Sequence, residues 1–199
     1  MPPNLDHEQA VTAPVAGVDE VGRGPWAGPV VACAVILDSK AIPAGLDDSK
    51  NLSAARRESL AAELLAKAEV GLGQVEAADI DRMNILAASM LAMERAVAAL
   101  PRRPAHALVD GNRAPKLSCP VTTVIKGDGR SVSIAAASIV AKVTRDQLMA
   151  ELASAHPGYG WERNAGYGTA EHRAGLNSRG VTEHHRRSFK PIAALLNGP

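Results

Sequence analysis

Short apolar runs alternate with longer stretches of helical periodicity along this chain of 199 residues. Apolar runs bounded by Gly, Pro, Asn or Asp indicate buried strands, whereas apolar residues spaced three and four apart indicate helices. The runs predict strands at residues 15–19, 30–37, 70–76, 106–110 and 121–126. The periodic stretches predict helices at residues 53–68, 79–100 and 131–155. This order of elements predicts an α/β fold with a five-stranded sheet flanked by helices.

Local signals support the ends of several of these elements. A turn rich in Gly and Pro joins the first two predicted strands, which we expect to pair like a hairpin. Ser53 is suited to cap the first long helix, and Pro101 ends the second. The helix at residues 131–155 begins with small apolar residues, so we expect it to pack closely against the sheet. The chain after residue 155 predicts a small extension of loops and short helices.

Composition narrows the class of protein. With 46% hydrophobic but only 3% aromatic residues, the chain must fill its core with Ala, Val, Leu and Ile. No apolar run reaches the roughly 20 residues that cross a bilayer, and no secretory signal is visible. Cys33 and Cys119 are too few for a disulfide framework or a zinc site. We therefore expect a cytoplasmic protein without a membrane segment.

The charge of the chain is nearly balanced. A net charge of +1 argues against a protein that binds nucleic acid through charge alone. Basic residues gather at residues 184–190, but such runs form a solvated surface more often than a binding patch. No Gly-x-x-x-x-Gly-Lys-Ser/Thr pattern occurs, which excludes a phosphate-loop NTPase.

Acidic residues stand at the ends of three predicted strands. Asp19 and Glu20 precede a Gly-Arg-Gly-Pro turn, Asp110 ends the fourth strand, and Asp128 follows the fifth. Active-site residues of open α/β sheets gather where strands end, so these carboxylates should converge. Without cations they would repel one another, whereas two Mg²⁺ ions roughly 3.5–4 Å apart would form a clamp for phosphodiester hydrolysis. Any one of these acids alone is more simply a turn residue or a helix cap, so only the joint pattern favours a metal site.

Six sequence motifs follow one another in a fixed order. The first is Ala-Gly-Val-Asp-Glu-Val-Gly-Arg-Gly-Pro at residues 16–25. The next are Asp-Ser-Lys-Asn-Leu-Ser at 48–53, Val-Asp-Gly-Asn at 109–112 and Lys-Gly-Asp at 126–128. The last are a small-residue helix ending in Lys-Val-Thr-Arg-Asp at 133–146 and Gly-Tyr-Gly-Thr-Ala-Glu-His at 166–172. Together they closely resemble the motifs of bacterial ribonuclease HII (type 2 ribonuclease H) and extend over nearly the whole chain.

The resemblance implies a ribonuclease H-like fold with a mixed sheet. We expect the chain to consist of a flexible leader (1–13), a catalytic domain (14–155) and a C-terminal helical region (156–199) that completes the substrate site. The implied activity is cleavage of the RNA strand of RNA/DNA hybrids and incision 5′ of single ribonucleotides in duplex DNA. Two metal ions, Mg²⁺ or Mn²⁺, would serve this hydrolysis, which leaves 5′-phosphate and 3′-OH ends. We expect a monomer that removes ribonucleotides from DNA and removes RNA primers.

The resemblance also assigns site residues. The family's metal-binding carboxylates map onto Asp19, Glu20, Asp110 and Asp128. Its Gly-Arg-Gly element is implied to read the ribose 2′-OH through backbone groups, which can approach a ligand closely on a glycine turn. Its tyrosine is implied to stack on the sugar of the following deoxynucleotide. The expected substrate-binding residues are Gly22, Arg23, Gly24, Lys50, Ser138, Lys142, Tyr167, Thr169 and His172.

Several of these residues also have simpler interpretations. Lys50 and Lys142 suit phosphate contacts, but a solvated lysine is the commoner case. Ser138 is about as well suited to packing inside its helix, and His172 to a helix surface. Asp146 is interpreted as a residue on a helix face and not as a fifth metal ligand.

Two other functions stay open at this point. One is a different metal-dependent nuclease of the same fold superfamily, such as a junction resolvase or an exonuclease, which would not be expected to combine Gly-Arg-Gly-Pro with Gly-Tyr-Gly-Thr. The other is a catalytically silent nucleic-acid-binding module, which has no use for four clustered carboxylates. Trp26 stands where the family more often has leucine, which affects only the expected packing of the turn. His184 and His185 are interpreted as scaffold residues.

Overall fold

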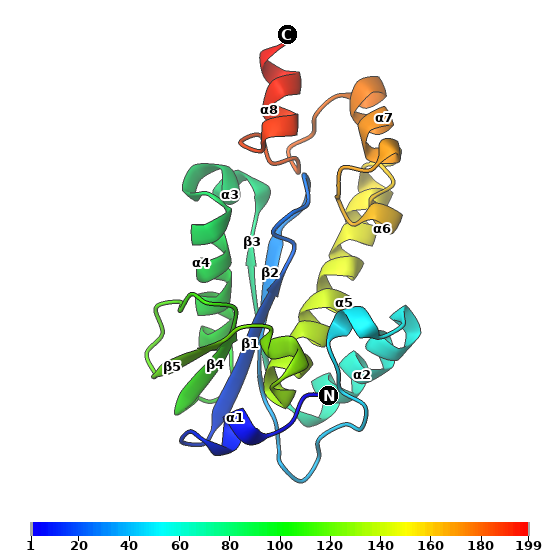
Figure 1. The fold of residues 1–199 in the computed structure, drawn as a ribbon. Coiled ribbons are helices and arrows are strands. Elements are labelled where there is room, and N and C mark those ends of the chain that lie inside the picture. The colour runs from blue at the N-terminus through cyan, green and yellow to red at the C-terminus, as the bar shows by residue number, and fades with distance from the viewer. Residues whose placement is uncertain (1, 199) are drawn as a thin grey trace.

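The five apolar runs form one mixed sheet in the computed structural model, which describes residues 2–198 (Figure 1). The strands lie in the order β3-β2-β1-β4-β5. Strand β2 pairs antiparallel with β1 and β3, whereas β4 pairs parallel with β1 and β5. Their bounds are β1 (Val15–Val21), β2 (Val30–Ile36), β3 (Glu69–Val75), β4 (His106–Asp110) and β5 (Val121–Val124). The predicted five-stranded α/β arrangement, with its first two strands paired like a hairpin, is confirmed.

Helices cover both faces of this sheet. Helix α4 (Ile85–Ala98) packs on one face, and α2 (Ala54–Lys67) and α5 (Val132–Ala155) pack on the other (Figure 1). Strand β2 is buried along its whole length because it lies between both helical layers. Helix α5 approaches β1 closely, since a Cβ atom on Gly17 would lie 2.1 Å from the backbone of Ser133. The close packing expected of the small-residue helix is therefore present.

The helix predicted at residues 79–100 is in fact two helices, α3 (Ala77–Met83) and α4. Asn84 lies between them with a φ of 72°, a left-handed conformation that interrupts a right-handed helix. Its side-chain oxygen then accepts hydrogen bonds from the amides of Leu86 and Ala87 and so caps α4. The single-helix prediction was wrong because the apolar periodicity continues across this break.

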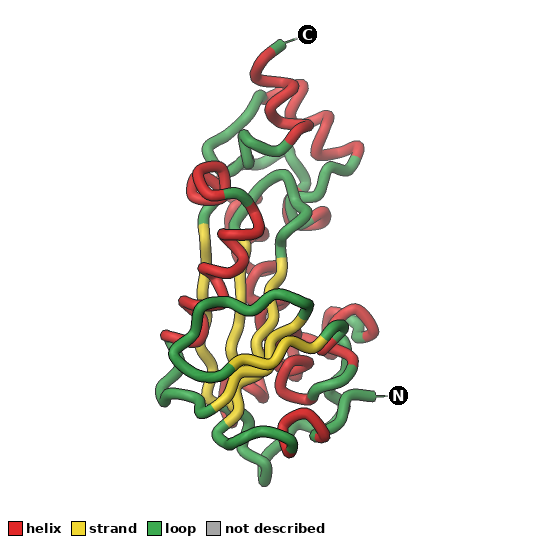
Figure 2. The backbone as a smooth tube through the Cα atoms, turned by 60° about the vertical axis from the view of Figure 1, so that its left-hand side comes forward, coloured by secondary structure: helices red, strands yellow, loops and turns green. Residues whose placement is uncertain are grey.

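The C-terminal part of the chain forms three further helices beyond the ends of the central strands. They are α6 (Trp161–Asn164), α7 (Ala170–Arg179) and α8 (Lys190–Asn197). They lie towards the C-terminal end of the molecule, away from the N-terminus (Figure 1), and Figure 2 shows the same separation of the two chain ends. Their apolar cluster includes Met149 of α5, so this region packs directly on the long helix. No helix in residues 2–198 is both long and apolar enough to span a membrane.

The segment expected to be a flexible leader contains a short helix, α1 (Asp6–Gln9), in its described part. Glu8 in this helix contacts the start of α5. Its Oε1 accepts hydrogen bonds from the Ser133 amide (2.9 Å) and from the hydroxyls of Ser131 (2.5 Å) and Ser133 (2.7 Å). Free amides and the helix dipole both favour a carboxylate at this position. Glu8 therefore caps α5, a contact between residues more than a hundred positions apart.

We predict that Glu8→Ala lowers the free energy of unfolding by about 1 kcal/mol, the usual cost of losing a helix cap. The corresponding fall in Tm is about 2–4 °C for a chain of this length. Thermal unfolding followed by circular dichroism measures it. The matched control is Glu151→Ala, which removes an exposed acid from the same helix and should leave Tm unchanged. Equal Tm values for Glu8→Ala and the unaltered protein would show that the cap contributes nothing.

Candidate active site

Four carboxylates meet at the edge of the sheet where β1, β4 and β5 end. Asp19 and Glu20 lie near the end of β1, and Asp110 is the last residue of β4. Asp128 lies in a short 3₁₀ turn, Gly127–Gly129, that follows β5. The parallel pairing of the three strands brings these ends together, and all four acids line one cavity of about 350 Å³. The convergence expected from the strand ends is present in the structure.

Asp128 reaches this cavity because β5 ends early. The strand stops at Val124, before the predicted end at residue 126, and Lys126 then adopts a left-handed φ of 56°. That conformation directs the chain into the 3₁₀ turn. The Gly127 amide in this turn donates a hydrogen bond of 2.7 Å to Oδ1 of Asp110. This hydrogen bond holds the turn that carries Asp128 against Asp110.

Burial and mutual repulsion raise the pKa of three of these acids. Burial, followed by the charges of Glu20 and Asp110, raises the pKa of Asp19 well above its ordinary value. Burial also raises the pKa of Glu20, although the Arg23 guanidinium, 3.2 Å from Oε1, acts in the opposite direction. The pKa of Asp110 is raised by burial and by the charge of Asp128, against the hydrogen bond from Gly127. The site thus holds more negative charge than its own cations balance.

The donor atoms of this site suit a hard divalent cation. All four side chains offer carboxylate oxygens, which Mg²⁺ and Mn²⁺ prefer, and their excess charge favours ionic partners. Lys50 lies beside them, with Nζ 3.0 Å from Oδ2 of Asp128 and 3.7 Å from Oδ1 of Asp48. Because the Lys50 side chain is largely exposed, it is also free to contact a phosphate. The residues present therefore fit the metal and the anionic substrate that the sequence predicts.

Two buried arginines, which the sequence analysis did not identify, hold the turn after β1. Arg186 donates to the carbonyl oxygens of Gly22 (2.5 Å) and Arg23 (2.9 Å), and Arg145 donates to three carbonyls nearby. Gly22 has a φ of +94°, and a Cβ atom there would lie 2.1 Å from Nε of Arg145, so only glycine fits. Within residues 2–198 the amides of Arg23 and Gly24 donate to no other residue. The turn therefore presents free N–H groups.

Burial lowers the pKa of Arg145 to about 10 and that of Arg186, which also faces Arg145, to about 9. Both side chains are still charged near neutral pH. In the sequence they look like ordinary surface residues, because they stand beside other charged residues in Arg-Asp and in His-His-Arg-Arg. Only their many carbonyl partners, which come from distant segments, explain their burial.

Tyr167 lines the same cavity as the four acids, and its side chain is about half exposed. Its ring lies beside the glycine turn, since a Cβ atom on Gly24 would be 3.3 Å from Cε1 of the tyrosine. Trp26 of the same turn covers Gly168, where an added Cβ atom would lie 2.1 Å from the indole. The tryptophan that departs from the expected leucine therefore packs the turn against the loop that carries Tyr167.

The chain matches the model of the ribonuclease HII family over residues 16–192. It belongs to the ribonuclease HII family. The ribonuclease HII of Jannaschia sp. (strain CCS1) is 62% identical over 199 residues and is matched along its whole length, as is this chain. That of Ruegeria pomeroyi is 65% identical over 183 residues, which are 92% of this chain and 78% of the relative. The structure of ribonuclease H2 from Pyrococcus horikoshii OT3 aligns with a TM-score of 0.77 at 28% identity, covering 92% of this chain and 97% of that one.

Membership of the ribonuclease HII family confirms the expected ribonuclease H-like fold and class of enzyme. The protein is a metal-dependent ribonuclease that hydrolyses RNA in RNA–DNA hybrids. This excludes a catalytically silent binding module and a junction resolvase. Family membership does not by itself say which residues of this chain contact the substrate. The position and burial of each expected residue bear on that question.

His172, which the sequence analysis expects at the substrate, lies inside the protein. His172 is completely buried, and its Nδ1 donates to the carbonyl oxygen of Tyr167 (3.0 Å). Its Nε2 accepts from Trp161 (3.2 Å) and from Nε2 of His185 (3.0 Å). Thr169 caps α7 by accepting from the His172 amide. His172 therefore supports the loop of Tyr167 from inside, and it has no polar atom left for a nucleic acid.

His185 completes this buried network. Burial and the neighbouring imidazoles lower its pKa to about 4, so the side chain is neutral near pH 7. A neutral His185 accepts a hydrogen bond from the Thr182 amide at Nδ1 (2.9 Å) and therefore carries its proton on Nε2. This agrees with the scaffold role expected for His185.

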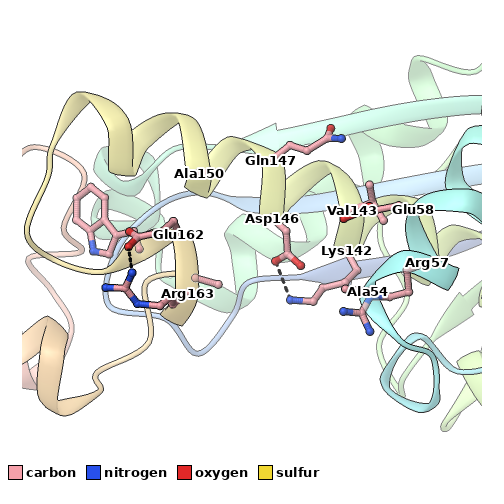
Figure 3. A pocket seen from close by; sticks show the side chains of 12 residues that line it. Ala54, Arg57, Glu58, Lys142, Val143, Asp146, Gln147, Ala150, Glu162 and Arg163 are labelled. Carbon is pink, nitrogen blue, oxygen red and sulfur yellow. Dashed lines mark hydrogen bonds and ion pairs between the residues drawn. The ribbon is translucent and has the colours of Figure 1, made fainter.

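The remaining expected contacts, Ser138 and Lys142, lie along α5. Ser138 is nearly buried at the cavity, with its Oγ 2.8 Å from Oγ of Ser49. Lys142 pairs with Asp146, Nζ to Oδ1, at 2.7 Å, which agrees with the interpretation of Asp146 as a helix-face residue (Figure 3). Lys142 and Arg57 line both the carboxylate cavity and a neighbouring cavity of about 450 Å³ (Figure 3). Basic side chains thus continue away from the acids, and Arg57 was not identified from the sequence.

We predict that Asp110→Asn raises the Tm of the metal-free protein by a few degrees at pH 8. The folded state raises the pKa of this carboxyl, so folding loses stability as the pH rises from the unfolded value towards the folded one. The variant removes that loss, and its advantage should shrink as the pH falls towards the ordinary pKa of an Asp side chain, about 4. Thermal unfolding in chelator measures the effect, with Glu151→Gln as the control for an exposed acid. A Tm at pH 8 equal to or below that of the unaltered protein would contradict the repulsion.

Proposed function

We propose that the protein is an endoribonuclease that cleaves the RNA strand of RNA/DNA hybrids and incises 5′ of single ribonucleotides embedded in duplex DNA. The products are 5′-phosphate and 3′-OH ends, and the roles are ribonucleotide removal and primer removal. The observation that carries the proposal is the common cavity of four acids, Lys50 and Tyr167, next to a turn with free amides. The C-terminal region 156–199 completes the substrate site by supplying Tyr167, and the chain acts as a monomer.

The four carboxylates of Asp19, Glu20, Asp110 and Asp128 would hold the metal. When bound, two ions of Mg²⁺ or Mn²⁺ would offset the carboxylate charge, lower the pKa of a water molecule and stabilise the leaving oxygen. Water as the nucleophile leaves the 2′-OH intact, whereas attack by the 2′-OH would give a cyclic phosphate. The chemical nature of the product ends therefore distinguishes attack by water from attack by the 2′-OH.

The turn and the tyrosine are suited to recognise the junction between RNA and DNA. The free amides of Arg23 and Gly24 are donors for the ribose 2′-OH, which alone distinguishes RNA from DNA at one position. Tyr167 stands beside Gly24 with its ring partly exposed, so it can pack on the next sugar. A 2′-OH on that sugar would crowd the ring, which favours a deoxyribose there.

Basic side chains near the acids provide phosphate contacts. Lys50, Lys142 and Arg57 all line the carboxylate cavity, and the last two continue into the neighbouring one. This basic path, from the acids along α5 towards α2, can follow the phosphates of one strand. Ser138 touches Ser49 in the same wall and so shapes the cavity beside Asp19.

The proposal is tested by cleavage with Mg²⁺ of four duplexes: DNA/DNA, RNA/DNA, RNA/RNA, and DNA with one ribonucleotide. We predict cleavage of the second and fourth only. Asp128→Asn should reduce both rates at least roughly 100-fold, because a lost metal ligand removes several kcal/mol of transition-state stabilisation. Asp79→Asn changes an acid on α3 outside the cavity and should retain activity. Near-normal turnover by Asp128→Asn would remove this residue from the metal site, and a 2′,3′-cyclic phosphate product would overturn the mechanism.

We further predict that Tyr167→Ala lowers incision at a single ribonucleotide by roughly 10-fold or more, the size of one lost stacking contact. Tyr167→Phe keeps the ring and should retain most of the activity. Both variants should unfold near the Tm of the unaltered protein, since the side chain is about half exposed. Rates on the duplex with one ribonucleotide, measured beside rates on the RNA/DNA hybrid, distinguish stacking from a general loss. Unchanged incision by Tyr167→Ala would refute the stacking role alone.

A further inference from the structure

A second group of metal-ligating side chains lies at the far end of α5. His156 directly follows this helix, and Glu183 and His184 lie between α7 and α8. One ligand atom from each of the three side chains lies within 4.8 Å of the other two. Lys142, which lines the carboxylate cavity, is separated from His156 by a helix rise of roughly 20 Å. The group is therefore distinct from the carboxylate site.

The ligand atoms of these three side chains are not used elsewhere. Among residues 2–198, neither imidazole nor the Glu183 carboxylate forms a hydrogen bond or an ion pair. The contacts of His184 come from its backbone, whose amide donates to Thr182 Oγ1 (3.3 Å) and whose carbonyl accepts from Gly28 (2.9 Å). These two hydrogen bonds fix the backbone of His184 without using its side chain. The lone pair of an imidazole nitrogen is therefore available to a ligand.

The two imidazoles are positioned before any ligand arrives. Their ring centroids lie 4.8 Å apart at 67°, an edge-to-face contact. The buried ring of Trp161 lies behind both, 6.1 Å from His156 and 6.3 Å from His184. Both histidines are half-buried, whereas Glu183 is exposed and can move towards an ion that enters from solvent.

We propose that His156, Glu183 and His184 bind a divalent transition-metal ion of the zinc class. Two imidazole nitrogens and one carboxylate are a ligand set that zinc accepts with water at the fourth position. The nitrogen ligands select Zn²⁺, Ni²⁺ or Cu²⁺ over Mg²⁺, which prefers oxygen. The site differs in this respect from the four carboxylates, so the two sites take different metals.

The position of the site gives it a structural role. The ion joins the end of α5 to the segment that leads into Arg186, whose guanidinium holds the carbonyls of Gly22 and Arg23. It thereby fastens the C-terminal region to the long helix without touching the acids. Its effect is expected first in stability, so binding can be measured apart from cleavage.

The test uses Zn²⁺ as the probe and the double variant Asp110→Asn, Asp128→Asn as the protein. The two substitutions weaken metal binding by the carboxylate site, and excess Mg²⁺ in the buffer competes with Zn²⁺ there. Calorimetric titration should show one Zn²⁺ bound per chain. At a free concentration 100-fold above Kd, Tm should rise by roughly 5–10 °C. No binding, or no rise in Tm upon binding, would overturn the proposal.

Two further substitutions in this background locate the ion. His156→Phe keeps a ring for the edge-to-face contact but has no ligand nitrogen, and Glu183→Gln keeps the size of an exposed side chain. Each should weaken Zn²⁺ binding at least 10-fold, while His7→Phe, on α1, should not. Undiminished binding by both site variants would show that the two histidines only pack together, and equal loss with His7→Phe would show non-specific binding. If His156→Phe does not fold, Glu183→Gln decides, since its side chain is exposed.

Discussion

The repulsion among four carboxylates in one partly buried cavity is the constraint on which the rest of this structure depends. Burial and mutual charge raise the pKa of Asp19, Glu20 and Asp110, so the acids can stay together only if the surrounding fold forces them to. The sheet does this by ending three neighbouring strands at one edge. A site that is unfavourable without metal is well prepared to bind one, because the cations relieve the repulsion.

Around this edge, buried cationic side chains hold the backbone, whereas Lys50 remains exposed to solvent. Arg145 and Arg186 direct their guanidinium groups at carbonyl oxygens of the glycine turn and its surroundings. The carbonyl oxygens of Gly22 and Arg23 are thus occupied, whereas the amides of Arg23 and Gly24 have no partner among residues 2–198, which is the polarity that the proposed contact with a ribose hydroxyl needs. Lys50, in contrast, remains largely exposed beside Asp128, where a phosphate can reach it. All three side chains are positively charged, so it is burial that distinguishes Arg145 and Arg186 from Lys50.

Support from distant segments recurs throughout the molecule. Glu8 caps α5 from the N-terminal segment, and His172 holds the loop of Tyr167 through a buried imidazole network. These contacts hold the start of α5 and the loop of Tyr167 in place through residues far apart in the chain. Helix α5 is central, since it packs on the sheet through small residues, lines the cavity, and carries Arg145.

The sequence by itself determined the strands, the long helices and the four converging acids, because apolar periodicity and acids after strands are local patterns. It did not reveal the break at Asn84, since one left-handed residue leaves the periodicity intact. Nor did it reveal the burial of Arg145, Arg186 and His172, which depends on partners far along the chain. Only the tertiary structure decided which polar residues line the carboxylate cavity and which lie buried behind it, because a charged or imidazole side chain has the same sequence signal in both positions.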